Sequence, residues 1–271
     1  MVILLTGGSG LVGTRLLPRL IADGHECRAL LRAGKEAPRG AHRVEGDLLE
    51  PGAWEAAVSG VDAVVHLAAQ FRSQDEQATW SVNHQGTRHL IAAVQKAAPA
   101  ARFLMASTSM IYDVDGARPG LEEDEARPSL AYPASKLAAE ADLRASGLNW
   151  SILRLSFVYG EQDGHLESLA PLLAQFQMHP AGSFSLIHHR DVAIAVRLAL
   201  SGVLDRKIVN IVDEAPTTAY ELVQFGGAEM APSSEPLVHP WRGRADGALA
   251  RSLGFQPSVR TIHQARAEGL L

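Results

Sequence analysis

The stretch Val2-Ile3-Leu4-Leu5-Thr6-Gly7-Gly8-Ser9-Gly10-Leu11-Val12-Gly13, at the start of the 271-residue chain, decides the fold. The apolar run at its beginning predicts a buried strand, the glycines predict a tight turn, and the apolar periodicity of Leu11–Ala22 predicts a helix. In this context the glycines let the backbone approach a pyrophosphate, and the helix start offers N–H donors and a positive dipole end. The pattern therefore predicts dinucleotide binding, with a plain strand-to-helix corner as the alternative.

Short apolar runs and longer amphipathic segments alternate through the first two thirds of the chain. This alternation predicts βαβ units, and hence an α/β fold with a doubly wound parallel sheet of the Rossmann type. The expected strands are Val2–Leu5, Cys27–Leu31, Ala63–Leu67, Phe103–Ala106, Ser151–Leu155 and Ile208–Ile211, and the expected helices are Leu11–Ala22, Trp80–Ala97, Ala134–Ala145 and Arg190–Leu200.

The regular alternation decays after Tyr159, where prolines divide the sequence into short segments. We therefore expect residues 1–160 to form the dinucleotide-binding domain, with 190–212 returning to it. Residues 161–189 and 213–271 are expected to form a small, loop-rich substrate lobe.

Composition excludes several classes of protein. The chain is 46% hydrophobic and 20% charged, with a formal net charge of −5 at pH 7, and it has no basic run to follow a nucleic-acid backbone, so no nucleic-acid partner is expected. Cys27 is the only cysteine, which excludes an internal disulfide and fits a reducing compartment. No apolar stretch is long enough for a membrane span, and the histidines lack metal-ligand spacing. A cytoplasmic location without membrane or metal partners is the resulting expectation.

The end of the second predicted strand bears on the choice of dinucleotide. Arg32 follows Cys27–Leu31, where an NAD-preferring site would carry an acidic residue for the ribose 2′-hydroxyl. A guanidinium there pairs well with a 2′-phosphate, which favours NADP(H) over NAD(H), and a solvated surface arginine is the alternative. Asp47, after the expected third strand, could accept a hydrogen bond from the adenine amino group or simply cap a turn.

The segment Tyr132-Pro133-Ala134-Ser135-Lys136 opens a predicted helix. Residues four apart share a helix face, so the Tyr132 hydroxyl and the Lys136 ammonium are expected to point into one cleft. A neighbouring cation favours the phenolate, and the pair would then transfer protons. Ser107-Thr108-Ser109 follows the strand Phe103–Ala106, at the carboxyl edge where such sheets bind ligands, and can orient a substrate oxygen. A tyrosine four before a lysine can also be an ordinary exposed pair.

Taken in order, these segments resemble the extended short-chain dehydrogenase/reductase family, in its NAD(P)-dependent epimerase/dehydratase branch. The matching stretches are Thr6–Gly13, Gly46–Leu48, His66–Ala69, Val82–Thr87, Ser107–Tyr112, Tyr132–Lys136, Arg154–Gly160, Arg190–Ala193 and Leu253–Pro257. The resemblance implies that Thr108, Tyr132 and Lys136 are catalytic. With the motifs above, it places the cofactor at Gly7, Gly10, Leu11, Val12, Gly13, Arg32, Asp47, Leu48, Leu67, Ala68, Ala69, Asn83, Tyr132 and Lys136.

Three departures from the family pattern restrict the expected chemistry. Ser109-Met110 stand where the family's sugar dehydratases carry an Asp-Glu pair, so dehydration is not expected. Glu161 replaces the proline of Tyr-Gly-Pro, and the C-terminal lobe is short, which argues against a bulky nucleotide sugar. The second-strand end Arg28–Arg32 is similar to that of the family's NADPH-dependent carbonyl reductases.

The sequence thus predicts an enzyme that transfers a hydride between nicotinamide and a carbonyl or alcohol carbon of a small molecule or sugar derivative. Tyr132 would exchange the proton, Lys136 would lower its pKa and hold the nicotinamide ribose, and Thr108 would orient the oxygen. The alternatives are a nucleotide-sugar epimerase with tightly bound NAD and a non-catalytic dinucleotide sensor; a homodimer is compatible with each. The substrate is expected to depend on the loops Phe71–Gln77, Asp163–Ser168 and Val238–Arg244, with His239, Trp241 and Arg242 as candidate lining residues or, for the aromatic, ordinary packing.

Overall fold

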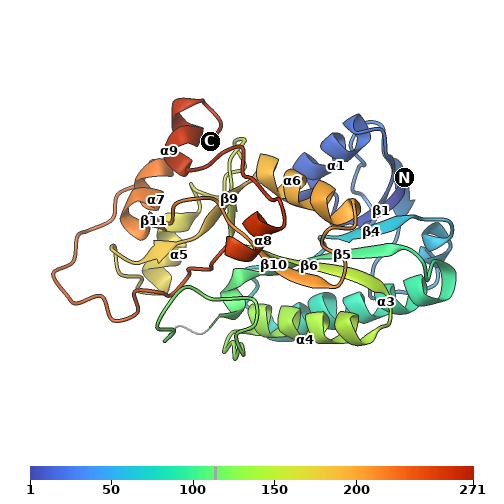
Figure 1. Cartoon of the computed structure of the whole chain (residues 1–271), viewed down its shortest axis with the longest axis horizontal. Coiled ribbons are helices and arrows are strands. Elements are labelled where there is room, and N and C mark those ends of the chain that lie inside the picture. Colours follow the sequence, from blue (N-terminus) through green and yellow to red (C-terminus); the bar gives the residue numbers. More distant parts are fainter. Residues whose placement is uncertain (113–114) are drawn as a thin grey trace. The chain divides into compact units, whose positions relative to one another are not determined.

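The computed structural model describes residues 1–112 and 115–271, and its main feature is a seven-stranded sheet (Figure 1). The strands stand in the order β10-β6-β5-β4-β1-β2-β3. Their bounds are β1 Val2–Thr6, β2 Glu26–Leu31, β3 His42–Glu45, β4 Ala63–His66, β5 Arg102–Thr108, β6 Asn149–Leu155 and β10 Lys207–Ile211. All the predicted strands are present, and most are extended by one or two residues.

The strand order changes direction at β1, which positions a ligand site. β1 pairs in parallel with β2 on one side and with β4 on the other, and Thr6 at its carboxyl end lies opposite Leu30 and His66. The chain leaves these strands toward opposite sides of the sheet, so a crevice forms beyond their carboxyl ends. The glycine turn follows β1 at this point.

Helices cover both faces of the sheet. In Figure 1, α3 (Gly86–Ala97) and α4 (Ala131–Ala145) lie together on one face, and α1 (Gly13–Ala22) lies on the other. The end of α6 (His189–Leu200) joins α1, because Arg197 Nε donates to Asp23 at 2.6 Å.

The segment predicted as one helix over Trp80–Ala97 is instead divided. A short helix, α2 (Glu76–Trp80), is followed by a π-helical turn, η2 (Ser81–Gln85), and then by α3. The wider turn coincides with Asn83, whose buried side chain bonds outside the helix. Such bulges occur where a helix must present one side chain at an unusual angle, and apolar periodicity does not reveal them.

The apolar core under α3 and α4 holds this half of the molecule together. Leu4, Val64 and Phe103 from three neighbouring strands are fully buried there with Leu90 of α3 and Leu143 of α4. Burying a side chain of this size stabilises a fold by about 1.5–3 kcal/mol. The carboxyl ends of the strands are therefore held on a rigid base.

The chain forms two compact units. The first comprises residues 1–108, 128–154 and 195–209, and the second comprises 109–127, 155–194 and 210–271. The segment 109–127, expected from the sequence to lie in the dinucleotide-binding domain, groups with the second unit. The backbone bridge between Gly120 and Ala245 and the bond from Asn210 Nδ2 to the Gly120 carbonyl, at 3.1 Å, hold it there.

The second unit is built from short elements around its own core, which includes Tyr159, Leu186, Leu222 and Ile262. These elements are η3 Ser109–Ile111, β7 Phe157–Tyr159, α5 Leu169–Gln175, β8 Ser183–Phe184, β9 Leu186–His188, β11 Thr217–Thr218, α7 Ala219–Phe225, α8 Ala248–Ser252 and α9 Ile262–Ala267. In the first unit, η1 Glu55–Val58 completes the set of elements described here.

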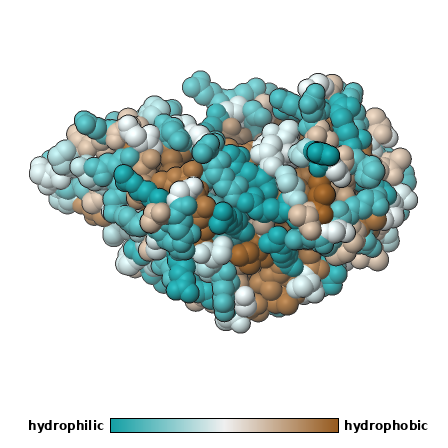
Figure 2. Space-filling view, turned by 90° about the horizontal axis from the view of Figure 1, so that it is seen from above, coloured by the Kyte–Doolittle hydropathy of each residue, from teal (hydrophilic) through white to brown (hydrophobic). Residues whose placement is uncertain are grey.

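The face drawn in Figure 2 is largely hydrophilic, with apolar residues in separate patches. None of the helices within the described residues is long and apolar enough to cross a membrane. Across residues 1–112 and 115–271, no group of three or more His, Cys, Asp or Glu side chains is placed to hold a metal ion.

Candidate active site

The glycine turn after β1 has a backbone that requires glycine at two positions. Gly7 has φ +76°, and a Cβ there would lie 2.6 Å from the Ala68 nitrogen. A Cβ at Gly13 would lie 2.1 Å from the Gly7 carbonyl oxygen. A Cβ at either position would force the backbone to shift. Because both residues are glycine, the turn, the start of α1 and the end of β4 can pack closely together.

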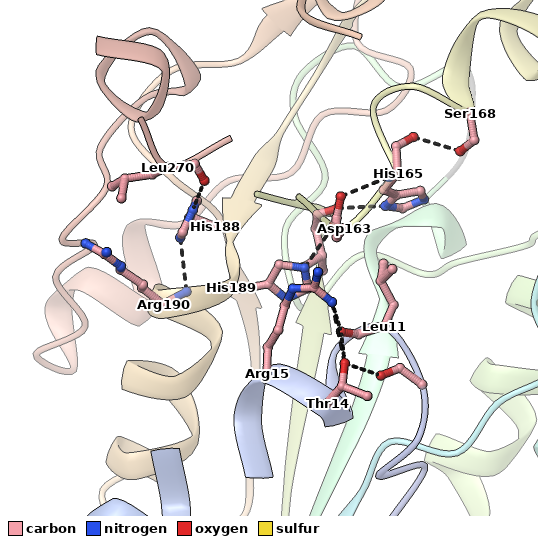
Figure 3. A network of polar contacts seen from close by, with 12 residues as sticks. Leu11, Thr14, Arg15, Asp163, His165, Ser168, His188, His189, Arg190 and Leu270 are labelled. Atoms are coloured by element: carbon pink, nitrogen blue, oxygen red, sulfur yellow. Dashed lines mark hydrogen bonds and ion pairs between the residues drawn. The ribbon is translucent and has the colours of Figure 1, made fainter. Parts of the chain in front are cut away.

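The first turn of α1 has no side-chain cap. Val12 precedes the helix without a side-chain capping bond, and the first turn holds no acidic residue. Thr14 Oγ1 and Arg15 Nη1 donate to the Leu11 carbonyl at 3.3 and 3.2 Å (Figure 3). An uncapped helix start beside a glycine turn suits a pyrophosphate.

The end of β4 is held by a buried histidine. His66 Nδ1 lies 2.7 Å from Thr6 Oγ1, and its Nε2 lies 2.8 Å from Thr87 Oγ1. Burial lowers the pKa of His66 to about 3, so the ring is neutral. The Thr6 hydroxyl also accepts from the Ala68 N–H at 3.3 Å. This network holds Leu67–Ala69 against the glycine turn, the position expected from the sequence.

The residues predicted to contact the adenosine part of the dinucleotide, Arg32, Asp47 and Leu48, differ in their exposure. Arg32 is exposed at the end of β2, and within the described residues no ion pair holds its guanidinium. Asp47 Oδ1 accepts from the Leu49 N–H at 2.9 Å, which is the turn-capping role left open above. Leu48 is 7% exposed and packs in the core, and its carbonyl lies 2.7 Å from His89 Nδ1.

Asn83 has a positioning role in this structure. Its Oδ1 accepts from the Gln70 N–H at 2.7 Å, and its Nδ2 donates to the Gln70 carbonyl at 3.0 Å and to Ser135 Oγ at 3.1 Å. The side chain is fully buried. It therefore joins the segment after β4 to the first turn of α4, and these protein groups occupy its amide.

The three predicted catalytic residues come together within the first unit. Thr108 ends β5, Tyr132 lies in the first turn of α4, and Lys136 follows one turn later. A side-chain hydrogen bond joins Thr108 and Tyr132, and Lys136 is 1% exposed. The strand end and the helix start thus place a hydroxyl pair and a buried ammonium at the carboxyl edge of the sheet.

The protonation of this group differs from the prediction. Burial raises the pKa of Tyr132 to about 12, against a smaller opposing effect of the bond to Thr108. Burial also lowers the pKa of Lys136 to about 8, against the opposing charge of Glu140. The predicted lowering of the Tyr132 pKa by Lys136 is not seen, because desolvation sets the direction of the shift. At neutral pH, Tyr132 is protonated.

A buried ion pair behind these residues was not predicted from the sequence. Glu140 Oε2 accepts from Arg154 Nη2 at 2.8 Å, and Glu140 Oε1 accepts from Arg154 Nε at 3.2 Å and from Ser107 Oγ. Glu140 and Arg154 are 1% and 3% exposed. An arginine within the apolar run of β6, and a glutamate four residues after Lys136, were the available signals.

In the second unit, the expected substrate loop around Asp163 is tightly held. Asp163 accepts from the His165 N–H at 2.9 Å and from His189 Nε2 at 2.8 Å (Figure 3). Burial alone would raise the pKa of Asp163, but these bonds hold it below its usual value. Glu161 has φ +58°, which proline cannot adopt, and this explains its departure from Tyr-Gly-Pro.

The other expected substrate loop, Val238–Arg244, makes one contact within itself and one with a distant segment of the second unit. The Arg244 guanidinium lies 4.8 Å from the centre of the Trp241 ring, and His239 Nδ1 lies 2.9 Å from Asp115. The packing alternative for Trp241 is therefore present in the structure.

A glycine turn at the strand-order reversal, a hydroxyl-bearing strand end and a Tyr-Lys helix together define the class of extended short-chain dehydrogenases/reductases. The family model described as the NAD dependent epimerase/dehydratase family matches residues 3–212, and the chain belongs to this family. The predicted resemblance and the predicted fold class are confirmed.

Solved structures share the fold of this chain, and curated proteins are similar to it in sequence. A short-chain dehydrogenase/reductase superfamily protein from Agrobacterium tumefaciens with bound NAD has TM-score 0.81 and 22% identity, covering 99% of this chain and 95% of its own. The NAD complex of UDP-glucose 4-epimerase from Thermus thermophilus has TM-score 0.77 and 25% identity, covering 98% and 99%. A Stigmatella aurantiaca enzyme, 4-hydroxy-2-methyl-3-oxo-4-farnesyl-3,4-dihydroquinoline-1-oxide ketoreductase, is 33% identical over 58% of this chain and 50% of its own. The chain spans half to two thirds of the length of the first curated relatives it matches.

Proposed function

We propose that this protein catalyses hydride transfer between a nicotinamide dinucleotide and a carbonyl or alcohol carbon of a small molecule, with Tyr132 as general acid and base. The observation that carries the proposal is the Thr108–Tyr132 hydrogen bond with buried Lys136 one helical turn away. All three residues lie at the sheet edge that also bears the glycine turn. A non-catalytic sensor would have no need for this group.

The glycine turn fits a dinucleotide, because Gly7 and Gly13 hold it closely against neighbouring backbone, whereas a Cβ at Gly10 would have only the Gly7 carbonyl oxygen within 4 Å, at 3.3 Å, so the space beside Gly10 is open. When bound, the dinucleotide supplies or accepts a hydride. In the reductive direction, Tyr132 donates its hydroxyl proton to the substrate oxygen, and Thr108 fixes the direction of that hydroxyl. The Lys136 ammonium stabilises the phenolate that Tyr132 becomes, until solvent returns the proton. Because its pKa is raised, Tyr132 is protonated at neutral pH and holds the proton that carbonyl reduction requires.

We further propose a preference for NADP(H), with NAD(H) as a weaker cofactor. Support comes from Arg32 at the end of β2, exposed and without an ion-pair partner among the described residues. Arg43 Nε also donates to the Lys35 carbonyl at 2.9 Å, which steadies the loop that follows Arg32. A guanidinium on a steadied loop can pair with a 2′-phosphate through two hydrogen bonds.

Epimerisation is the second candidate, favoured by the similarity to the Thermus UDP-glucose 4-epimerase. A reductase releases the oxidised dinucleotide after each transfer, whereas an epimerase returns the hydride and retains its cofactor. The similarity to a ketoreductase favours the reductase.

The test is a purified-protein assay with NADPH and NADH against aldehydes, ketones and nucleotide sugars, together with native mass spectrometry. We expect stoichiometric dinucleotide oxidation with a carbonyl substrate, faster with NADPH. Retained dinucleotide and interconversion of two sugars without net oxidation would favour the epimerase. Absence of dinucleotide binding would refute both.

A further inference from the structure

The segment between β4 and α2 is fixed at both ends. At its start, Asn83 accepts from the Gln70 N–H and donates to the Gln70 carbonyl, at 2.7 and 3.0 Å. At its end, the Asp75 N–H donates to Ser73 Oγ at 3.1 Å, and Asp75 Oδ1 caps α2 by accepting from the Ala78 N–H at 2.9 Å. Residues 71 and 72 are therefore a short projection between two anchored ends.

This projection places an aromatic ring on the general acid. The Phe71 and Tyr132 ring centroids are 4.7 Å apart with an interplanar angle of 55°. Arg72 has φ +56°, an unfavourable conformation for a residue with a side chain, and its guanidinium lies 5.2 Å from the Phe71 ring centre. The backbone thus adopts a strained turn at the point where it presents Phe71 to Tyr132.

One side chain fixes both partners of the ring pair. Asn83, which holds Gln70, also donates to Ser135 Oγ at 3.1 Å, and that hydroxyl donates to the Tyr132 carbonyl at 2.8 Å. The loop base and the helix turn that carries Tyr132 are consequently joined through Asn83. The position of Phe71 beside the phenol is therefore set by the same network that sets the phenol itself.

Phe71 is also open to solvent, with 42% of its surface exposed beside a tyrosine that burial has desolvated. A substrate oxygen that takes the proton of Tyr132 must lie at its hydroxyl, so the neighbouring substituent lies within reach of this exposed ring. The ring itself covers an apolar or aromatic substituent well and offers sugar hydroxyls no hydrogen bond, although the Arg72 guanidinium lies 5.2 Å from its centre.

We propose that Phe71 determines substrate specificity, and that the protein takes carbonyl compounds with an apolar, preferably aromatic, group beside the carbonyl rather than polyhydroxylated ones. This inference rests on the proposed function, because it assigns a residue that contacts the substrate beside Tyr132. No covalent step is added: the carbonyl carbon gains the hydride from the reduced dinucleotide, and its oxygen gains the proton of Tyr132.

The experiment compares two aldehydes, phenylacetaldehyde and glyceraldehyde, with saturating NADPH, in the wild type and in Phe71→Ala, Phe71→Leu and Phe176→Ala. Phe176 is the matched control, since it is an aromatic of nearly equal exposure, 41%, outside the first unit. We expect the wild type to favour phenylacetaldehyde. We expect Phe71→Ala to lower its kcat/KM by about 10-fold or more, chiefly through KM, with glyceraldehyde changed less than about 2-fold. Phe71→Leu should give an intermediate loss, and Phe176→Ala none.

Two results would overturn the assignment of Phe71 and leave the proposed function intact. In the first, the wild type reduces glyceraldehyde with the same kcat/KM as phenylacetaldehyde. In the second, Phe71→Ala lowers kcat/KM for both aldehydes equally, which would mean that Phe71 only positions Tyr132. Tyr132→Phe, assayed in parallel, separates these from failure of the proposed function. If that variant keeps wild-type turnover, the hydride-transfer proposal fails and the specificity inference falls with it; if the wild type reduces neither aldehyde but reduces a ketone or a nucleotide sugar, only the specificity inference falls.

Discussion

At the scale of single residues, the proposed mechanism predicts a pH dependence that arises from the buried ammonium of Lys136. The pKa of Lys136 is lowered to about 8, whereas that of Tyr132 is raised to about 12. Tyr132 therefore stays protonated through the neutral range, and the group that titrates is Lys136. Its charge is present below about pH 8 and is lost as the pH rises through that value.

For carbonyl reduction we expect kcat/KM to be highest below about pH 8 and to fall above it, as Lys136 loses the charge that stabilises the forming phenolate. Lys136→Arg keeps a positive charge at all these pH values, so its profile should show no such fall, at a lower absolute rate. Steady-state kinetics from about pH 6 to about 10 make the comparison. If the wild type and Lys136→Arg show the same inflection in kcat/KM, the group that titrates is not Lys136.

Arg32 gives a second prediction at this scale. Arg32→Ala should weaken NADP binding by about 10- to 100-fold, because a charge-assisted bidentate contact is lost, and should leave NAD binding nearly unchanged. Isothermal titration calorimetry with both dinucleotides measures the two affinities. Equal losses for both would show that Arg32 has no part in reading the 2′-phosphate.

The sequence predicted some site residues and not others for a physical reason. Thr108, Tyr132 and Lys136 were predicted from the helix spacing, the hydroxyl-bearing strand end and the family resemblance, and the loop that begins at Phe71 was expected to bear on the substrate. The contact of Phe71 with Tyr132 and the ion pair of Glu140 with Arg154 were not predicted, because each joins two different elements of the fold. Burial, which raises the pKa of Tyr132, is likewise a property of the folded environment and is not visible in the spacing.

At the scale of elements, the contact between the glycine turn and α1 is a packing constraint that can be measured. A Cβ at Gly13 would meet the Gly7 carbonyl oxygen at 2.1 Å, whereas a Cβ at Gly10 would approach the same atom only to 3.3 Å. We expect Gly13→Ala to lower the free energy of unfolding by about 1–3 kcal/mol, and Gly10→Ala to change it much less. Urea denaturation followed by circular dichroism tests this, and equal effects would place the strain elsewhere.

The buried pair between α4 and β6 leads to a larger effect. Glu140→Ala leaves the Arg154 guanidinium buried without its carboxylate, so the free energy of unfolding should fall by about 3–5 kcal/mol. Glu125→Ala is the matched control, because it removes an exposed ion pair with Arg127, for which about 0–1 kcal/mol is typical. If the two variants unfold at the same urea concentration, the buried pair does not stabilise the fold.

Helix boundaries show where sequence patterns stop being informative. Apolar periodicity predicted a continuous helix over Trp80–Ala97, yet the chain forms α2, a π turn and α3. The π turn contains Asn83, whose side-chain amide bonds to Gln70 and to Ser135. Periodicity records which face of a helix is buried, but not the hydrogen bonds of one side chain on that face.

At the scale of the whole molecule, the alternation of strands and helices was sufficient to predict the doubly wound parallel sheet, and the structure adds the strand order with its reversal at β1. The division of the chain into two units was harder to predict from the sequence. Segment 109–127 joins the second unit through Gly120 and Asn210, contacts made with distant parts of the chain. Local composition carries no record of such contacts, so the boundary after Thr108 required the structure.

The most direct test of the proposed mechanism is the rate of a single hydride transfer in Tyr132→Phe, measured by stopped-flow absorbance of NADPH with the aldehyde that the wild type reduces best. The variant loses only the hydroxyl that Thr108 holds, so we expect unchanged NADPH affinity and a transfer rate lower by about 100- to 10,000-fold. A wild-type rate in Tyr132→Phe would contradict the role of Tyr132 as the proton donor.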